Sequence, residues 1–314
     1  MRLIFMGTPE LARTILQALL DSPSFEIAAV VTQPDRPKGR DLRLTASPVK
    51  ELARQAGLPI LQPERARDPN FISQILEVRP DLIAVAAYGQ ILPKPLLDIP
   101  SHGCLNVHTS LLPRYRGAAP IQWAILNDDA ETGVTIMKMD EGLDTGEILT
   151  QEKTAITPAD NAQTLYDRLA KIGAALLVRT IPSYVSGAIV PRPQPSEGAL
   201  LAPKIKKQDG QIDWTQSSRS IWNRVRGLVP WPCAYTHLRA EPRPQMLKIW
   251  EAEPTDHSGP AGQIIEAGNS GIVVACGKGA LRILSLQREN ARRLTAEQFL
   301  AGCPLAPGQH LGEG

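Results

Sequence analysis

Asn106 and His108 are the residues of this sequence best placed to do chemistry. They lie two positions apart in the short apolar run Cys104–His108, which predicts a β-strand. Side chains alternate between the two faces of a strand, so both residues project to the same side. The amide donates hydrogen bonds, and the imidazole can also exchange a proton. Together they can polarise a carbonyl group and handle a proton at one point in space.

A carboxylate can extend this pair into a candidate site. Asp144 lies 36 residues after His108, in the acidic and glycine-rich stretch Met139–Gly146 that follows another predicted strand. An amide, an imidazole and a carboxylate at the ends of neighbouring strands would make a proton-handling triad. The residues alone leave a second interpretation open, in which Asn106 and His108 form a structural hydrogen-bonded pair and Asp144 is an ordinary turn residue.

The elements that must position these residues alternate between strand and helix. The runs that predict strands are Leu3–Met6, Ile27–Thr32, Leu82–Ala86, Cys104–His108 and Val134–Met139. Helical spacing predicts helices over Pro9–Leu20, Pro48–Gly57, Phe71–Val78 and Thr164–Ser186. This alternation predicts an α/β domain with a Rossmann-like, mostly parallel sheet. Such sheets bind ligands where their strands end in polar loops, as Cys104–His108 does before the loop with Arg114 and Arg116.

The pattern changes after Ile189. Pro191, Pro193, Pro195 and Pro203 predict a stiff, extended linker. The strands predicted beyond it are short: Ala234–Leu238, Gln245–Ala252, Gln263–Glu266, Gly271–Ala275 and Ala280–Leu286. With a helix over Ser217–Val225, they predict a small OB-like β-barrel. The predicted division is therefore a catalytic domain over residues 1–189, a linker over 190–207 and a barrel domain over 208–314.

Composition and motifs exclude several classes of site. With 43% apolar and 21% charged residues in 314, the chain is typical of a globular protein. Its four cysteines contain no Cys-x-x-Cys pair, so neither a zinc site nor a disulfide framework is expected. Gly7-Thr8-Pro9 lacks the Gly-x-Gly-x-x-Gly fingerprint, so no nicotinamide cofactor is expected. We expect a cytoplasmic protein without membrane contact, because neither a signal peptide nor a run of about 20 apolar residues is present.

Basic residues gather at two places. Residues 204–314 hold 14 Lys/Arg against 10 Asp/Glu, whereas residues 1–203 hold 20 against 22. The predicted loop over residues 33–44 is also rich in Arg and Lys. Both places are either solvated surfaces or grips for the phosphates of a nucleic acid. Trp214, Trp222 and Trp231 are predicted to anchor the second core, with base stacking by one of them as the alternative.

Motifs along almost the whole chain resemble the folate-dependent formyltransferases, and among them the methionyl-tRNA formyltransferase family. Asn106-Val107-His108 followed by Ser110-Leu111-Leu112-Pro113 resembles the signature of the wider group, and Asp144 within Gly142–Gly146 supplies its third member. Ala87–Pro93 is similar to a folate-pocket segment. The segments that resemble the tRNA-specific family are Phe5–Glu10, Gln33–Arg40, Ala202–Ile205, Ile212–Trp214, Arg226 and Pro230–Pro232.

This resemblance implies a reaction and its participants. The donor would be 10-formyltetrahydrofolate, the acceptor the amino group of methionyl-initiator tRNA, and no metal would be needed. Asn106, His108 and Asp144 would be catalytic. The implied folate contacts are Tyr88, Gly89, Ile91, Ser110, Leu111, Leu112 and Pro113. The implied tRNA contacts are Arg36, Lys38, Arg40, Arg43, Lys204, Lys206 and Lys207. We expect the protein to act as a monomer.

Three other functions are compatible with parts of this pattern. A formyltransferase that acts on a small amine would share Asn106, His108 and Asp144 but would not need the basic loop or the second domain. A formyltetrahydrofolate hydrolase would replace the amine with water. A non-catalytic RNA-binding protein would rely on the barrel alone, and the presence of all three polar side chains argues against it.

Overall fold

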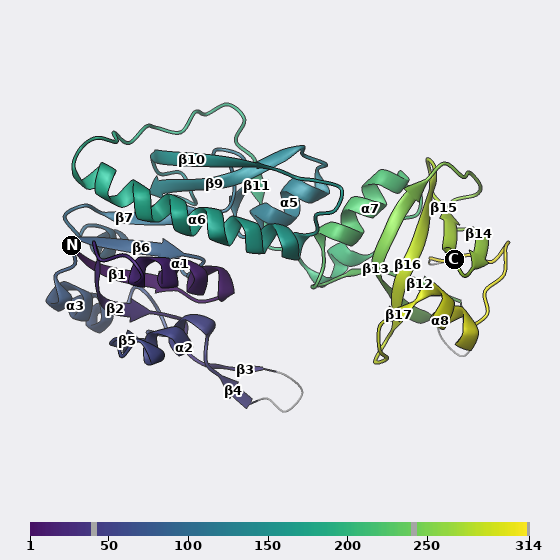
Figure 1. The fold of residues 1–314 in the computed structure, drawn as a ribbon, viewed down its shortest axis with the longest axis horizontal. Coiled ribbons are helices and arrows are strands. Elements are labelled where there is room, and N and C mark those ends of the chain that lie inside the picture. The colour runs from purple at the N-terminus through teal and green to yellow at the C-terminus, as the bar shows by residue number, and fades with distance from the viewer. Residues whose placement is uncertain (39–42, 240–243, 313–314) are drawn as a thin grey trace. The chain divides into compact units, whose positions relative to one another are not determined.

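The first part of the chain forms the predicted α/β domain, with a mixed and mostly parallel sheet. The computed structural model describes residues 1–38, 43–239 and 244–312, and within them the sheet has the order β10-β9-β7-β6-β1-β2-β5 (Figure 1). Its parallel members are β1 (Arg2–Gly7), β2 (Glu26–Val31), β5 (Ile60–Leu61), β6 (Leu82–Ala86) and β7 (Cys104–His108). The strands predicted at β1, β2, β6 and β7 are therefore confirmed to within one residue at each end, and β5 was not predicted.

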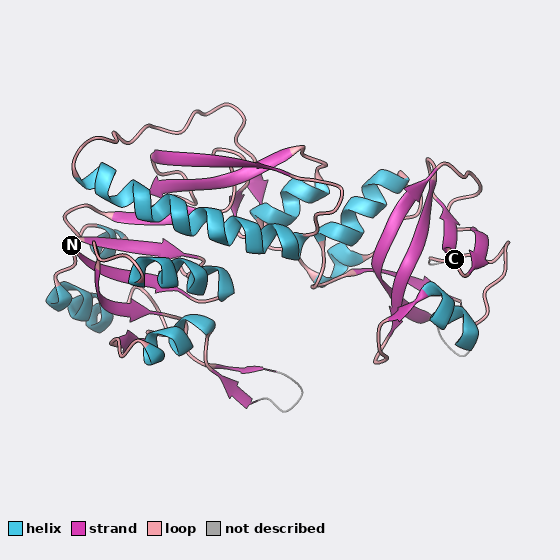
Figure 2. Ribbon diagram, viewed as in Figure 1, coloured by secondary structure: helices cyan, strands magenta, loops and turns pink. Residues whose placement is uncertain are grey.

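Both faces of this sheet are covered by helices, which explains why its strands are apolar at nearly every position. On one face, Ile4 and Met6 of β1 pack with Phe71 and Ile75 of α3 (Pro69–Val78) in one hydrophobic cluster. The alternate residues of β1 are equally buried on the other face. That face carries α1 (Glu10–Leu20) and α6 (Ala162–Val185) (Figure 2). Gly173 of α6 lies against the side chains of Val107 and Val134.

Two antiparallel strands extend the sheet beyond β7. β9 (Glu131–Lys138) lies antiparallel to β7, and β10 (Ile148–Ala155) continues as the edge strand. β10 escaped prediction because every residue from Thr150 to Thr154 is polar or charged, as suits an edge strand. The chain reverses between β9 and β10, and Asp144 lies in that connection.

Several short elements were also not predicted. Part of the segment over residues 33–44 is a hairpin of β3 (Arg36–Lys38) and β4 (Arg43–Thr45), so its prediction as a loop throughout was wrong. Its charged residues and Pro37 concealed the strand pattern. The helix predicted over Pro48–Gly57 is confirmed as α2 (Pro48–Gln55). The other short elements, which were not predicted, are α4 (Lys94–Leu97), β8 (Arg116–Gly117), α5 (Pro120–Leu126) and β11 (Leu201–Ala202).

The contacts divide the chain into two compact units. The first consists of Met1–Pro120, Glu131–Ala155 and Tyr166–Ala202, and the second of Ile121–Ala130, Ile156–Leu165 and Pro203–Gly314. The predicted linker, residues 190–207, is thus shared between them: its part up to Ala202 packs as part of the first unit. The predicted domain boundaries remain a prediction.

The second unit is built on an antiparallel sheet. Its order is β12-β13-β16-β15-β14, and β17 pairs with β16. The strands are β12 (Ala234–Leu238), β13 (Gln245–Thr255), β14 (Ile264–Gly268), β15 (Gly271–Ala275), β16 (Ala280–Arg288) and β17 (Leu294–Thr295). A single core joins this sheet to α7 (Ser218–Gly227) and α8 (Ala296–Gly302). The 3-10 helix η1 (Lys207–Gly210) precedes them.

The three tryptophans of this unit have different environments. Trp214 and Trp222 are buried in its core, as predicted. Trp231 is 56% exposed, so its prediction as a core anchor was wrong. It stands between Pro230 and Pro232, beyond the end of α7, where the backbone cannot continue a helix.

Candidate active site

A cavity of about 560 Å³ opens at the carboxyl ends of β1, β6 and β7. The chain leaves β1 toward β2 on one side, while β6 and β7 extend the sheet on the other, so this is a topological switch point of the kind that binds ligands in open α/β sheets. The lining includes Leu11 after β1, the segment Ala87–Leu92 after β6, and the end of β7. The end of Cys104–His108, where the sequence predicts a ligand site, therefore lies at this cavity.

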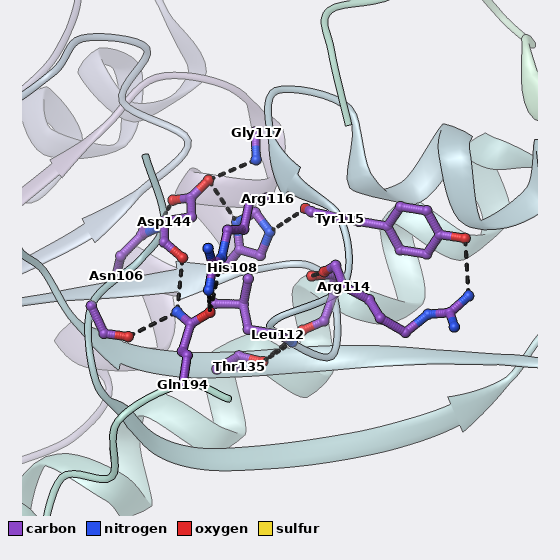
Figure 3. A network of polar contacts seen from close by, with 12 residues as sticks. Asn106, His108, Leu112, Arg114, Tyr115, Arg116, Gly117, Thr135, Asp144 and Gln194 are labelled. Carbon is purple, nitrogen blue, oxygen red and sulfur yellow. Dashed lines mark hydrogen bonds and ion pairs between the residues drawn. The ribbon is translucent and has the colours of Figure 1, made fainter. Parts of the chain in front are cut away.

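Asn106, His108 and Asp144 meet at this cavity (Figure 3). His108 Nδ1 lies 3.6 Å from Asp144 Oδ2, and Asn106 Nδ2 lies 3.5 Å from Asp144 Oδ1. The His108 side chain is only 6% exposed and that of Asp144 16%. Asn106 and His108 share one face of β7, as their spacing predicts. The distances from His108 Nδ1 and Asn106 Nδ2 to the Asp144 carboxylate are long for hydrogen bonds. Both nitrogens therefore lie near the carboxylate without forming short hydrogen bonds with it.

The turn after β7 fixes the His108 ring. Its Nε2 atom lies 2.9 Å from the carbonyl oxygen of Tyr115, a residue in the left-handed region with φ of 62°. The Ser110 hydroxyl donates to the Arg114 carbonyl at 2.6 Å and so closes this turn. Since a carbonyl can only accept, Nε2 carries the hydrogen in this contact.

The predicted folate contacts after β7 lie behind the site. Ser110 is fully buried, and Leu112 packs with Met137 and Ile148 in a small cluster. The Thr135 hydroxyl donates to the Ser110 carbonyl at 2.7 Å and accepts from the Leu112 N–H at 3.1 Å. The residues from Ser110 to Pro113 are not among the described residues that line the cavity. Their direct contact with folate remains a prediction, and the geometry gives them a supporting role.

The loop between β9 and β10 carries Asp144 in a demanding conformation. Asp144 has a φ of 52°, in the left-handed region where a residue with a Cβ is uncommon. The Asp140 carboxylate braces the loop by accepting from the Thr145 hydroxyl at 2.8 Å and from the Gly142 N–H at 3.1 Å. A Cβ on Gly146 would lie 1.8 Å from the Lys138 carbonyl oxygen, so only glycine allows this close return to β9.

A backbone donor anchors the Asp144 carboxylate. The Gly117 N–H donates to Asp144 Oδ2 at 2.9 Å. Gly117 has a φ of 119°, and a Cβ there would lie 2.8 Å from the carbonyl oxygen of Ala202 on the neighbouring strand β11. Glycine is therefore required at this position on two grounds. Among the described residues, the second carboxylate oxygen, Oδ1, has only the long contact from Asn106, so it is the better placed to accept a proton.

The segment after β6 supplies another wall of the cavity. Tyr88, Gly89 and Ile91, the folate contacts implied by the resemblance, all line it, and their contact with folate remains a prediction. The Tyr88 carbonyl accepts from the Thr8 hydroxyl at 3.2 Å and from Gln33 Nε2 at 3.1 Å. The Tyr88 ring packs in the hydrophobic cluster beneath the cavity, where burial raises the pKa of its hydroxyl to about 12. This wall is therefore tied through its backbone to the turns after β1 and β2.

Two apolar side chains are exposed beside the cavity. Ile91 is 81% exposed and Leu143 57%, and both belong to its lining. They come from opposite walls, Ile91 after β6 and Leu143 just before Asp144. Large apolar side chains in a lining with a few polar groups are typical of a small-molecule site, where apolar surface supplies affinity and polar groups orient the ligand.

The predicted phosphate-binding residues fall in both units. Arg36 is exposed on β3 of the first unit, and Lys204, Lys206 and Lys207 are exposed in the second. Arg40 lies outside the described residues, as do the side chains of Lys38 and Arg43. Within the described part of the chain, no three His, Cys, Asp or Glu side chains gather as a metal site, and no helix is long and apolar enough to cross a membrane.

Three contacts at the site were not predicted from the sequence. They are the carbonyl of Tyr115 on His108, the N–H of Gly117 on Asp144, and the side chain of Gln194 on the Asp144 loop (Figure 3). The first two use backbone groups, which leave no mark on residue type. Gln194 lies among prolines that predicted only a linker, so nothing in its neighbourhood indicated a site.

Solved structures share this fold. The N-formyltransferase from Helicobacter canadensis, in complex with folinic acid and dTDP-3-aminofucose, superposes with a TM-score of 0.65 at 19% identity, covering 91% of this chain and 99% of that one. HypX from Aquifex aeolicus in complex with tetrahydrofolic acid gives a TM-score of 0.62 at 15% identity, covering all of this chain and 51% of that one. At these identities the likeness concerns the fold.

Sequence comparison is more specific. Residues 1–181 match the formyl transferase family, and residues 204–304 match the formyl transferase C-terminal domain. The methionyl-tRNA formyltransferase of Geobacter metallireducens is 48% identical over 310 residues, which cover 99% of this chain and 98% of the relative. That of Trichlorobacter lovleyi is 50% identical over 307 residues, covering 98% and 96%. This chain therefore belongs to the methionyl-tRNA formyltransferase family.

Proposed function

We propose that this chain transfers the formyl group of 10-formyltetrahydrofolate to the α-amino group of methionyl-initiator tRNA, giving N-formylmethionyl-tRNA for translation initiation. The observation that carries this function is the meeting of Asn106, His108 and Asp144 at one cavity. The full-length relatives named above support the choice of acceptor. A reaction on initiator tRNA would take place in the cytoplasm.

The cavity suits the folate donor. Its volume of about 560 Å³ is within the range of small-molecule sites. Ile91 and Leu143 offer apolar surface to a flat ring system, while the polar triad stands at the reacting end. Tyr88 and Gly89 would contact the donor from the β6 side, with Ser110–Pro113 as the support behind. Two proteins of the same fold are named with tetrahydrofolic acid or folinic acid bound, which supports the folate class of ligand.

The triad can lower the barrier to formyl transfer by electrostatics and proton handling. As the amine attacks the formyl carbon, negative charge develops on the formyl oxygen. Asn106 Nδ2 and a protonated His108 Nδ1 would donate to that oxygen. Asp144 Oδ1 would take one proton from the attacking amine, directly or through water, and pass it on to the folate N10 as the bond between N10 and the formyl carbon breaks. The protein supplies position and charge, while the donor supplies an activated formyl group.

The acceptor would be held by basic residues of both units. Arg36, Lys38, Arg40 and Arg43 belong to the hairpin segment, and Lys204, Lys206 and Lys207 precede the second sheet. Arginine and lysine side chains neutralise phosphates without reading sequence, which suits a grip on the tRNA backbone. The antiparallel sheet of the second unit would act as an OB-like barrel, a fold used to bind nucleic acids.

One assay separates this function from its rivals. Labelled formyl from 10-formyltetrahydrofolate is offered to methionyl-initiator tRNA, to small amines such as amino sugars, or to water alone. Label in the tRNA and in neither of the other products is the expected result. Label appearing as free formate without acceptor would identify a hydrolase, and rapid labelling of a small amine would identify a different acceptor. Either result would overturn the proposed function.

A further inference from the structure

The proline-rich segment 190–202, called the strap here, is hydrogen-bonded across the walls of the active site. Arg192 exchanges both backbone hydrogen bonds with Ile148 of β10, at 2.8 and 2.9 Å. Farther along, the Arg116 N–H donates to the Leu200 carbonyl at 2.8 Å, and β11 pairs with β8. The strap therefore touches the loop that carries Asp144 on one side and the turn that carries Gly117 on the other.

Gln194 is the strap residue that reaches both of these segments (Figure 3). Its Nε2 atom donates to the carbonyl oxygens of Asp144 and Gly146, each at 2.8 Å. Its Oε1 atom accepts from Arg116 Nε at 3.0 Å and from Arg116 Nη2 at 2.7 Å. A primary amide has two N–H donors and two lone pairs on its oxygen, and here all four are used.

These contacts act on the two features that orient the Asp144 carboxylate. The first is the left-handed backbone of Asp144, with φ of 52°, which an aspartate adopts only when its surroundings impose it. Gln194 binds the carbonyl of that residue and the carbonyl two residues later. The second is the Gly117 N–H, which donates to Asp144 Oδ2 and follows directly on Arg116. Gln194 thus joins the backbone that bears the carboxylate to the turn that anchors it.

We propose that Gln194 is a positioning residue, which holds the Asp144 carboxylate against His108 through the Asp144 and Gly146 carbonyls and through Arg116. This role rests on the proposed function, in which Asp144 accepts the proton of the attacking amine. Gln194 does not itself line the cavity among the described residues, so it acts through Asp144 and not on the substrate.

Three variants test this role by steady-state kinetics with methionyl-initiator tRNA and 10-formyltetrahydrofolate. Gln194→Ala removes all four hydrogen bonds. Gln194→Glu keeps acceptor oxygens for Arg116 but replaces the amide donors that bind the two carbonyls. Ser196→Ala changes an exposed residue of the same strap and is the matched control. Melting temperatures are measured for all of them.

A positioning role predicts a specific pattern. Both Gln194 variants should lower kcat by roughly 10- to 100-fold, the scale of a small misplacement of a catalytic group, while both KM values stay within about twofold. Their melting temperatures and the kinetics of Ser196→Ala should match those of the unmodified protein. Full kcat in Gln194→Glu, or a loss of kcat that follows a loss of folded protein, would overturn the proposal.

A double-mutant cycle with Asp144→Asn shows whether Gln194 acts through Asp144. In the Asp144→Asn background, Gln194→Ala should cost less than about twofold in kcat, because the group it positions no longer takes a proton. Equal effects of Gln194→Ala in both backgrounds would overturn the positioning role. If Asp144→Asn alone kept full turnover, the proposed function of Asp144 would fail, and the inference about Gln194 with it. If Asp144→Asn lost turnover while Gln194→Ala kept full turnover, only the positioning role of Gln194 would be overturned.

Discussion

The Nδ1 atom of His108 lies 3.6 Å from Oδ2 of Asp144, while Nε2 of the same ring lies 2.9 Å from the carbonyl oxygen of Tyr115. Both ring nitrogens therefore face hydrogen-bond acceptors. A neutral imidazole with its N–H on Nε2 makes the shorter contact, and at 3.6 Å the contact of Nδ1 is longer than a hydrogen bond. The arrangement places an imidazole and a carboxylate side by side at the cavity where a substrate amine would lose a proton.

Replacing Asp144 with asparagine keeps its shape and removes its charge and its basicity. We expect kcat for formyl transfer to fall by roughly 10²- to 10⁴-fold, the usual contribution of a positioned acid or base. Asn106→Ala and His108→Ala should also lower kcat, because each removes a donor for the formyl oxygen. Affinity for the folate donor, measured by calorimetry, should change little in all three. Near-normal turnover in any one of them would show that its assigned role is wrong.

The exposed lysines before the second sheet should contribute to tRNA binding through charge. For Lys204→Gln, Lys206→Gln and Lys207→Gln, we expect the slope of log K against log salt concentration to fall by about one per lysine that contacts a phosphate. Lys278→Gln, at an exposed site of the same unit, serves as the control. Unchanged slopes in filter-binding assays, even for the triple variant, would argue against this phosphate grip.

The corresponding test for the hairpin segment is Arg40→Ala, which should weaken use of charged tRNA and leave the chemical step intact.

Tyr88 offers a test of what the β6 wall contributes. Its hydroxyl is buried in an apolar cluster and has no hydrogen-bond partner among the described residues. Tyr88→Phe should leave donor affinity unchanged and keep the free energy of unfolding equal or raise it by up to about 1 kcal/mol, since an unsatisfied polar group disappears. Tyr88→Ala should lower the free energy of unfolding by about 3–5 kcal/mol, because it leaves a cavity in the core. Urea unfolding and donor titration check both, and weaker donor binding by Tyr88→Phe would show that the hydroxyl contacts the ligand.

The four cysteines should differ in reactivity. Burial raises the pKa of Cys104 and of Cys276 to about 12, so both thiols stay protonated and unreactive at pH 8. Burial also raises the pKa of Cys233, whereas Cys303 is partly exposed. We expect one thiol per folded chain to react quickly with Ellman's reagent, and all four after unfolding in guanidinium chloride. Peptide mapping should place the fast label on Cys303, and fast labelling of Cys104 would contradict the described burial.

The sequence by itself determined most strands of the parallel sheet and the first members of the site. Apolar runs that are buried on both faces read as strands whatever their neighbours, so Leu82–Ala86 and Cys104–His108 are found with the predicted bounds. The two-residue period of a strand placed Asn106 and His108 on one face. The edge strand β10 and the hairpin of β3 and β4 escaped because their residues are polar or charged, and their pairing depends on partners elsewhere in the chain.

Only the tertiary structure decided what surrounds Asp144. The left-handed backbone of that residue, the N–H of Gly117 and the carbonyl of Tyr115 are backbone features, which the residue types of the sequence do not encode one by one. Gln194 lies 50 positions from Asp144, and its amide gained a role only when the strap folded back across the site. Contacts between residues so far apart in the sequence depend on the packing of the whole unit. The residue types therefore indicate the reacting groups, and the fold determines how those groups are held.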